Sequence, residues 1–163
     1  MGERTNISWT NHTWNPWQGC HKVSLGCKHC YAETLVEKRM GRKFTEIRRS
    51  ASATFNAPLK WKEPARVFTC SISDFFIEEA DAWRDDAWEI IRRTPHLTYQ
   101  ILTKRPERIL THLPKVWWDA EQSWEPKGWP WPNVWLGTSV ENQKYAEKRI
   151  PQLVSVPAKV HFL

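Results

Sequence analysis

Short apolar runs alternate with segments of helical periodicity along most of the chain. The run 67–73 (VFTCSIS) is rich in β-branched and aromatic residues, and 97–103 (LTYQILT) has the same character. Further runs of this kind lie within 7–16, 133–140 and 158–163. Runs that are apolar almost throughout are typical of strands buried on both faces of a parallel sheet. The pattern therefore predicts five strands.

Segments with helical spacing follow these runs. The segment 74–93 spaces its apolar residues as one face of a helix, with Asp74 as a fitting N-cap and Thr94-Pro95 as a fitting stop. Three more helices are predicted over 30–42, 104–113 and 141–153. In the first of these, the residues expected to face inward are Tyr31, Leu35 and Val36.

The alternation of strands and helices indicates an α/β fold built on a parallel sheet. An exposed edge strand of such a sheet needs a neighbour. About five strands and four helices therefore predict a partial, incomplete parallel β/α barrel of the TIM-barrel kind, the N-terminal part of a longer barrel. Either a missing C-terminal half or a second chain would complete it, and a small open sheet is the alternative.

Residues 1–163 are expected to form a single β/α domain. Two segments interrupt the alternation, a long loop at 45–65 and a Pro/Trp-rich insertion at 115–132. Long loops in compact domains are often functional. Most of the twelve tryptophans are expected to serve packing, because an indole ring buries a large area.

Charge and composition limit the kinds of ligand and the cellular location that we expect for this protein. The net charge of +6 favours nucleic acid or an anionic ligand, and a basic protein with no such ligand is the alternative. No apolar run is long enough for a membrane helix, and the N-terminal residues lack the pattern of a signal peptide. A cytoplasmic protein with reduced cysteines is expected.

Three of the four cysteines, Cys20, Cys27 and Cys30, fall in one loop (20–30) with the spacing C-x6-C-x2-C. An odd number of thiols in a reducing compartment argues against disulfides. Thiolates are soft ligands, so a metal site is the preferred interpretation. Gly19 and Gly26 let the backbone curl and point N–H groups at sulfur.

Three thiolates leave one coordination position open, either on a tetrahedral zinc ion or on one iron of a [4Fe–4S] cluster. An open position is typical of a catalytic site. Cys70 could supply a fourth ligand, but a small buried residue is the preferred interpretation of it. A Cys3His zinc site completed by His12, His21 or His29 is the runner-up.

Five sequence blocks, in order, resemble the phage "gene product 37/68" family, whose poorly characterised three-cysteine proteins are similar to radical S-adenosylmethionine (SAM) enzymes. The blocks are ISWTNHTWNPWQGCHKVSLGCKHCYAE, PLKWKEPARVFTCSISDFF, HLTYQILTKRPER, NVWLGTSVENQKYAEKRI and PAKVHFL. Family members usually continue for about as much chain again, with further strands.

The resemblance implies that Cys20, Cys27 and Cys30 bind three irons of a [4Fe–4S] cluster, and that SAM binds the fourth. An electron donor would then drive cleavage of SAM to a 5′-deoxyadenosyl radical that takes hydrogen from a substrate. The common radical SAM pattern has three residues in the first cysteine gap, whereas this chain has six. His29 takes the position of the family's usual aromatic residue and would lie against the SAM adenine.

Polar residues follow each predicted strand, and active sites of parallel barrels lie where the strands end. We expect one rim to carry the cofactor-binding residues Ser71, Ser73, Asp74, Thr103, Lys104, Arg105, Thr138, Ser139, Glu141 and Asn142. Lys104 and Arg105 would hold the SAM carboxylate or an anionic substrate, and Glu141 the SAM amino group or ribose hydroxyls. Alternatively, Asp74 and Asn142 cap helices and the two cations are solvated.

The sequence therefore predicts a radical-SAM-like iron–sulfur protein that acts on an unknown, nucleic-acid-related substrate. Two alternatives stay open, a zinc-binding nucleic-acid module and an inactive or split half of the enzyme. Neither the catalytic residues nor the electron donor follows from the sequence.

Overall fold

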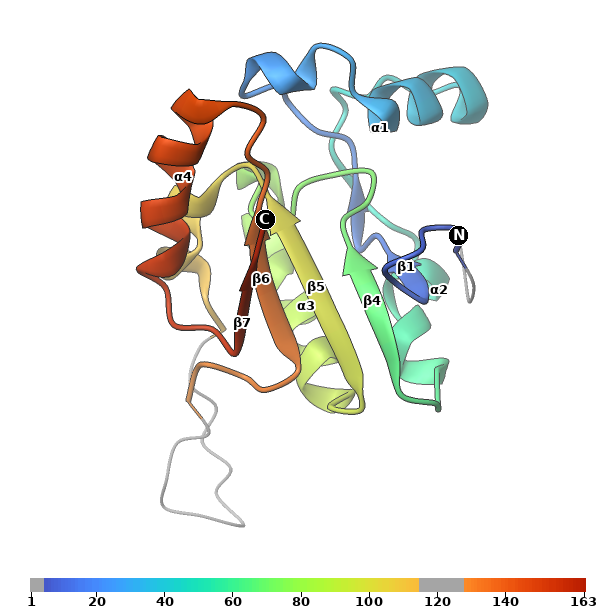
Figure 1. The fold of residues 1–163 in the computed structure, drawn as a ribbon. Coiled ribbons are helices and arrows are strands. Elements are labelled where there is room, and N and C mark those ends of the chain that lie inside the picture. The colour runs from blue at the N-terminus through green and yellow to red at the C-terminus, as the bar shows by residue number, and fades with distance from the viewer. Residues whose placement is uncertain (1–4, 115–127) are drawn as a thin grey trace.

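The computed structural model describes residues 5–114 and 128–163, and within them the central element is a five-stranded parallel sheet (Figure 1). The sheet has the strand order β1-β4-β5-β6-β7. Its strands are β1 (His12–Trp14), β4 (Ala65–Thr69), β5 (Leu97–Thr103), β6 (Val134–Thr138) and β7 (Val160–Phe162). Each strand of this sheet therefore lies beside the one that precedes it along the chain. A separate antiparallel pair joins β2 (Trp17–Gln18) to β3 (Arg48–Arg49).

The burial of β5 shows why these residues form a central strand. Leu97, Tyr99 and Ile101 alternate along the strand and have no exposed surface. The Tyr99 hydroxyl hydrogen-bonds with that of Thr94, at the end of α3, so this face of the sheet is the one covered by helices. Gln100, on the opposite face, is also buried. The apolar run therefore correctly predicted a strand buried on both faces.

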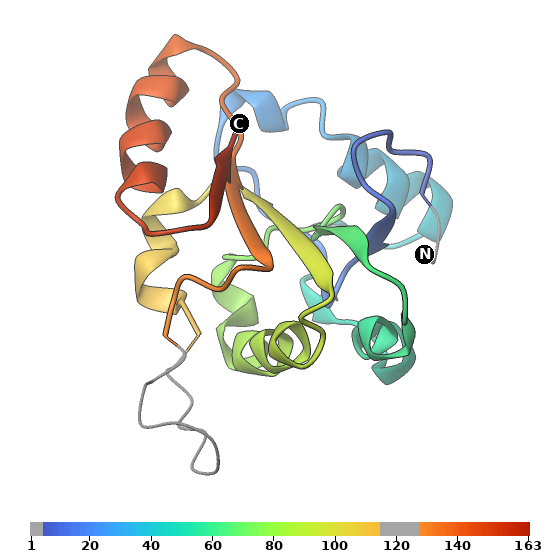
Figure 2. The same cartoon turned by 60° about the horizontal axis from the view of Figure 1, so that its bottom comes forward.

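Four α-helices occur in the described part of the chain, namely α1 (Tyr31–Thr34), α2 (Ser52–Phe55), α3 (Asp81–Arg93) and α4 (Gln143–Val154). A π-helical stretch, Leu35–Arg39, continues α1. Helices α2, α3 and α4 lie on one side of the sheet, and α1 lies across the carboxyl ends of the strands (Figures 1 and 2). The α1 segment is thus placed over the edge where parallel-sheet active sites form.

Aromatic side chains fill the layer between the sheet and the helices. Trp14, Trp17 and Trp88 are almost completely buried, and the indole N–H of each donates to a backbone carbonyl, those of Phe55, Asp74 and His112 respectively. These tryptophans serve packing, as expected. Truncating such a ring to alanine costs about 3–5 kcal/mol of stability.

The bounds of two predicted elements are wrong around Asp74. The strand predicted over 67–73 ends at Thr69, because residues from Cys70 onward form a turn. The helix predicted over 74–93 begins at Asp81, after a 3-10 turn at Glu78–Ala80. Asp74 therefore does not cap that helix. Its carboxylate instead accepts hydrogen bonds from Thr103 and Lys104, at the end of β5.

Three further expectations also need correction. The segment 104–113 forms two 3-10 turns, Pro106–Arg108 and Leu110–His112, and not an α-helix. The loop predicted at 45–65 contains β3, α2 and the 3-10 turn Ala57–Lys60. Tyr31 does not face the core but is largely exposed at the cavity, where its hydroxyl donates to the carbonyl of Ser71.

The described sheet is open, with the three-residue strands β1 and β7 at its two edges and no contact that closes it into a barrel. Most of the predicted insertion, 115–127, lies outside the described residues. Just after it, Trp129 and Trp131 pack on Trp88 of α3. Among the helices of the described residues, none combines the length and the apolar character needed to cross a membrane.

Candidate functional site

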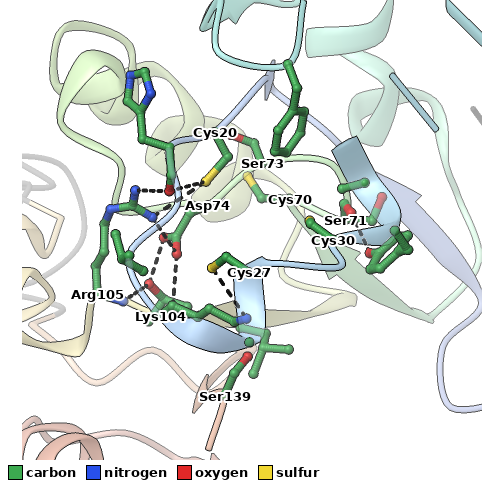
Figure 3. Close-up of a pocket in the computed structure, with 18 of the residues that line it drawn as sticks. Cys20, Cys27, Cys30, Cys70, Ser71, Ser73, Asp74, Lys104, Arg105 and Ser139 are labelled. Carbon is green, nitrogen blue, oxygen red and sulfur yellow. Dashed lines mark hydrogen bonds and ion pairs between the residues drawn. The ribbon is translucent and has the colours of Figure 1, made fainter. Parts of the chain in front are cut away.

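A cavity of about 250 Å³ lies at the carboxyl ends of the strands and is lined by all four cysteines (Figure 3). Cys20, Cys27 and Cys30 reach it from the loop before α1, and Cys70 reaches it from the turn after β4. The turns after β5 and β6 add Lys104, Arg105 and Ser139. Segments far apart in sequence therefore combine thiols, hydroxyls and cations in one cavity.

The start of the cysteine loop is held by backbone contacts that only glycine permits. Gly19 has a φ of +89°, and a Cβ there would lie 2.7 Å from the Glu46 carbonyl oxygen. The Gly19 carbonyl accepts a hydrogen bond of 2.6 Å from Ser73, and the next amide, that of Cys20, donates to Phe44. Cys20 is therefore fixed between the turn after β4 and the segment that follows α1.

The turn after β4 is held by Asn15, which follows β1 and is almost fully buried. Its side-chain oxygen accepts from the Ile72 amide at 3.0 Å. Cys70, the first residue of this turn, has a φ of +66°, a conformation that costs an L-residue on the order of 1 kcal/mol. This turn carries four residues into the cavity, Cys70, Ser71, Ser73 and Asp74.

Asp74 joins the turns after β4 and β5. Its carboxylate accepts hydrogen bonds from the Thr103 hydroxyl at 2.7 Å and from the Lys104 amide at 2.9 Å. Arg105 lies 3.1 Å from the same carboxylate, and both side chains are largely buried. A buried carboxylate held by this many donors makes a rigid support for the cavity wall.

Two cations lie beside two of the thiols. The Arg105 guanidinium donates to the Cys20 sulfur at 3.6 Å and to the His21 carbonyl at 3.0 Å. The Lys104 ammonium lies 3.7 Å from the Cys27 sulfur. Positive groups at these distances favour thiolates over thiols, and thiolates are the form that binds metal.

The two thiols differ in acidity. Burial acts to raise the pKa of Cys27, but hydrogen bonds with the Val23 and Ser24 backbone and the Ser24 hydroxyl, together with the Lys104 charge, leave it below its ordinary value. Burial, and after it the charge of Asp74, raises the pKa of Cys20 to about 11 in spite of Arg105. Cys27 is therefore the more readily ionised thiol when no metal is bound.

Glu141, which lies between β6 and α4, connects that segment to the cysteine loop. One carboxylate oxygen accepts from the Ser24 hydroxyl at 2.7 Å and lies 2.9 Å from the Lys104 ammonium, and the other lies 3.1 Å from Arg149. A Cβ on Gly26 would lie 2.3 Å from the Glu141 side chain, so the loop can approach this closely only with glycine there. Glu141 thus holds the loop through one oxygen and pairs with Arg149 through the other, which has no hydrogen-bond partner among the described residues.

The spacing of the ligand groups bears on which metal group fits. No three His, Cys, Asp or Glu side chains within residues 5–114 and 128–163 lie close enough together to hold a single ion. A zinc ion needs its ligand atoms about 2.0–2.3 Å from one centre. In a [4Fe–4S] cluster each cysteine binds a different iron, so the sulfurs are spread around it. Within the described residues, the structure therefore shows four thiols around one cavity and no preformed single-ion site.

The structure brings most of the rim residues chosen from the sequence together. Those that line the cavity are His29, Ser71, Ser73, Asp74, Thr103, Lys104, Arg105 and Ser139. The other three do not line it. Thr138 is buried and donates to the Thr103 carbonyl, Glu141 makes the contacts above, and Asn142 is the N-cap of α4, where it accepts from the Tyr145 amide.

Sequence reasoning missed the apolar part of the lining, formed by Val23, Phe68 and Leu102 among others. Phe68 and Leu102 lie in β4 and β5, where their spacing resembles that of any buried strand residue, so no sequence signal distinguishes them. For Cys70 the sequence left two interpretations open, a fourth ligand and, as the preferred one, a small buried residue. Its burial is confirmed, but its place in the cavity could not be read from its strand-like context.

The fold and the site define a class, α/β proteins with a cysteine-rich cavity at the carboxyl edge of a parallel sheet. A family model described as "Protein of unknown function (DUF5131)" matches residues 4–163. The chain belongs to that family. Searches of curated proteins and of solved structures found no match.

Proposed function

We propose that this chain is a radical-SAM-like iron–sulfur protein in which Cys20, Cys27 and Cys30 hold a [4Fe–4S] cluster. The observation that carries the proposal is that these three thiols share one cavity with the polar turns at the carboxyl edge of the sheet. The resemblance to the phage gene product 37/68 family supports the same assignment. In this interpretation the open sheet is the first part of a β/α barrel.

The surrounding residues suit such a cluster. A bound cluster would supply the electron that cleaves SAM reductively, after an external donor has delivered it. Lys104 and Arg105 donate to Cys27 and Cys20, and hydrogen bonds to cluster sulfurs raise the reduction potential. These two residues would therefore help the cluster accept that electron.

SAM would occupy the rest of the cavity, next to the loop cysteines. The SAM carboxylate would bind near Lys104, which lines the cavity and has a partly exposed side chain. The Ser139 hydroxyl and the His29 ring are further polar groups of the lining, whereas the hydroxyls of Ser71 and Ser73 already donate to Asn15 and to the Gly19 carbonyl. Glu141 is a weaker candidate for the SAM amino group, because it does not line the cavity and its oxygens already lie against Ser24, Lys104 and Arg149.

A nucleic-acid-related substrate agrees with the distribution of charge. Residues 21–49, which include most of the cysteine loop and all of α1, contain eight Lys and Arg and three Glu, a net charge of +5, whereas the whole chain has +6. We expect the K38E/R39E double variant to weaken salt-sensitive binding of a single-stranded oligonucleotide in fluorescence anisotropy. The matched K144E/K148E variant on the exposed face of α4 should bind as the wild type does; equal loss in both would remove this support.

The test of the iron–sulfur assignment is anaerobic purification followed by iron, sulfide and zinc analysis. We expect a brown protein with about four irons per chain. Replacing any one of Cys20, Cys27 and Cys30 with alanine should abolish both the cluster and the reductive cleavage of SAM to 5′-deoxyadenosine.

The control is Val67→Ala, which opens a hole in the buried face of β4 without touching the cavity. It should keep the cluster. A colourless wild type with one zinc per chain would contradict the proposal and would favour the zinc-binding alternative.

A further inference from the structure

We propose that Cys70 is a fourth sulfur ligand of the same site, bound to the iron that the three loop cysteines leave open until SAM displaces it. This inference rests on the proposed iron–sulfur function. It assigns a role to a thiol outside the cysteine loop, at the end of a strand.

The position of Cys70 is the first argument. The residue lies 50 positions beyond Cys20 in sequence, yet its side chain lines the cavity together with the three loop thiols (Figure 3). A fourth thiol therefore reaches the cavity from the turn after β4, an element separate from the cysteine loop.

The surroundings of its sulfur are the second argument. Cys70 is only 3% exposed, and in the described part of the chain its sulfur has no hydrogen-bond partner. By contrast, Cys20 and Cys27 each accept from a cation. A buried thiol turned into a thiol-lined cavity, without another partner, is placed to coordinate metal.

The exchange involves ligands only, with no change of oxidation state. When Cys70 binds, its S–H proton goes to solvent and an S–Fe bond forms. When the SAM amino and carboxylate groups arrive, that S–Fe bond breaks and the thiol takes up a proton again. Without SAM, Cys70 would thus protect the fourth iron. When SAM is present, the fourth iron would be free to bind it.

The experiment compares wild type, Cys70→Ala and Val67→Ala, each loaded anaerobically with iron and sulfide in the absence of SAM. Mild oxidation with ferricyanide removes an exposed iron and leaves a three-iron cluster, which electron paramagnetic resonance detects. We expect Cys70→Ala to lose its fourth iron at least about tenfold faster than wild type, in line with the effect of weakened metal coordination. Val67→Ala should match wild type and controls for loosened packing in β4.

Equal rates of iron loss in wild type and Cys70→Ala would overturn the inference. Equally accelerated iron loss in Cys70→Ala and Val67→Ala would overturn it as well. A wild type that binds no cluster at all would instead refute the proposed function. A wild type that binds a cluster which Cys70→Ala holds equally well refutes only the role of Cys70.

Discussion

At the scale of single residues, the cavity holds chemically similar thiols in different electrostatic surroundings. Cys27 lies between the Ser24 hydroxyl at 3.6 Å and the Lys104 ammonium at 3.7 Å. Arg105 acts to lower the pKa of Cys20, whereas the buried carboxylate of Asp74 acts to raise it. The two thiols should therefore differ in reactivity, because the thiolate is the nucleophile.

In the metal-free, reduced protein, we expect iodoacetamide at pH 7.5 to modify Cys27 before Cys20. The pKa of Cys27 is lowered, so its thiolate forms at lower pH, whereas the pKa of Cys20 is about 11. Mass spectrometry of peptides taken over a time course measures the order. Lys104→Met should slow the reaction of Cys27, while the exposed Lys144→Met should leave it unchanged; the reverse order of labelling would contradict this account.

At the scale of elements, local signals predicted α4 well and the segment after β5 poorly. The α4 region begins with a capping residue and places Leu153 in the core. In 104–113, Arg105 and Arg108 turn instead to Asp74 and to the Phe76 carbonyl, and the backbone forms 3-10 turns. Tertiary partners therefore outweighed helical spacing in that segment.

The N-cap of α4 gives a test at this scale. Asn142→Ala should destabilise the protein by about 1 kcal/mol, because the Tyr145 amide loses its acceptor. Asn142→Asp keeps an acceptor oxygen and should have nearly wild-type stability. Urea unfolding measures both. If Asn142→Ala removed cluster or SAM binding while stability stayed unchanged, Asn142 would be a site residue and not a cap.

At the scale of the whole molecule, contacts between distant segments hold the cysteine loop in place. Ser24 and Glu141 are 117 residues apart and lie 2.7 Å from each other. Gly19 and Ser73, 54 residues apart, form another such contact. The loop is thus attached both to the turn after β4 and to the start of α4, across the carboxyl edge of the sheet.

Glu141→Gln tests the second attachment. Burial acts to raise the pKa of Glu141, but hydrogen bonds from Lys104, Ser24 and Arg149 leave it below its ordinary value. Its stabilising effect is therefore present above the unfolded carboxyl pKa and is lost as pH falls through the lowered folded value. We expect a loss of about 1–3 kcal/mol at pH 7 and a much smaller difference near pH 3.

Thermal unfolding at the two pH values provides this measurement. Glu147→Gln, at an exposed position of the same helix, is the matched control and should change stability little. A difference between wild type and Glu141→Gln that persisted at acid pH would show that the ion pairs are not its cause.

The sequence by itself determined the alternation of strands and helices, the strand at Leu97–Thr103 and the cluster of thiols in one loop. These features depend on side-chain periodicity and on spacing within a few residues, which the chain carries locally. Only the tertiary structure decided that β4 ends at Thr69, that Asp74 supports the β5 turn, and that Cys70 shares the cavity. The physical reason is that each of these depends on partners tens of residues away, whose contacts no local pattern encodes.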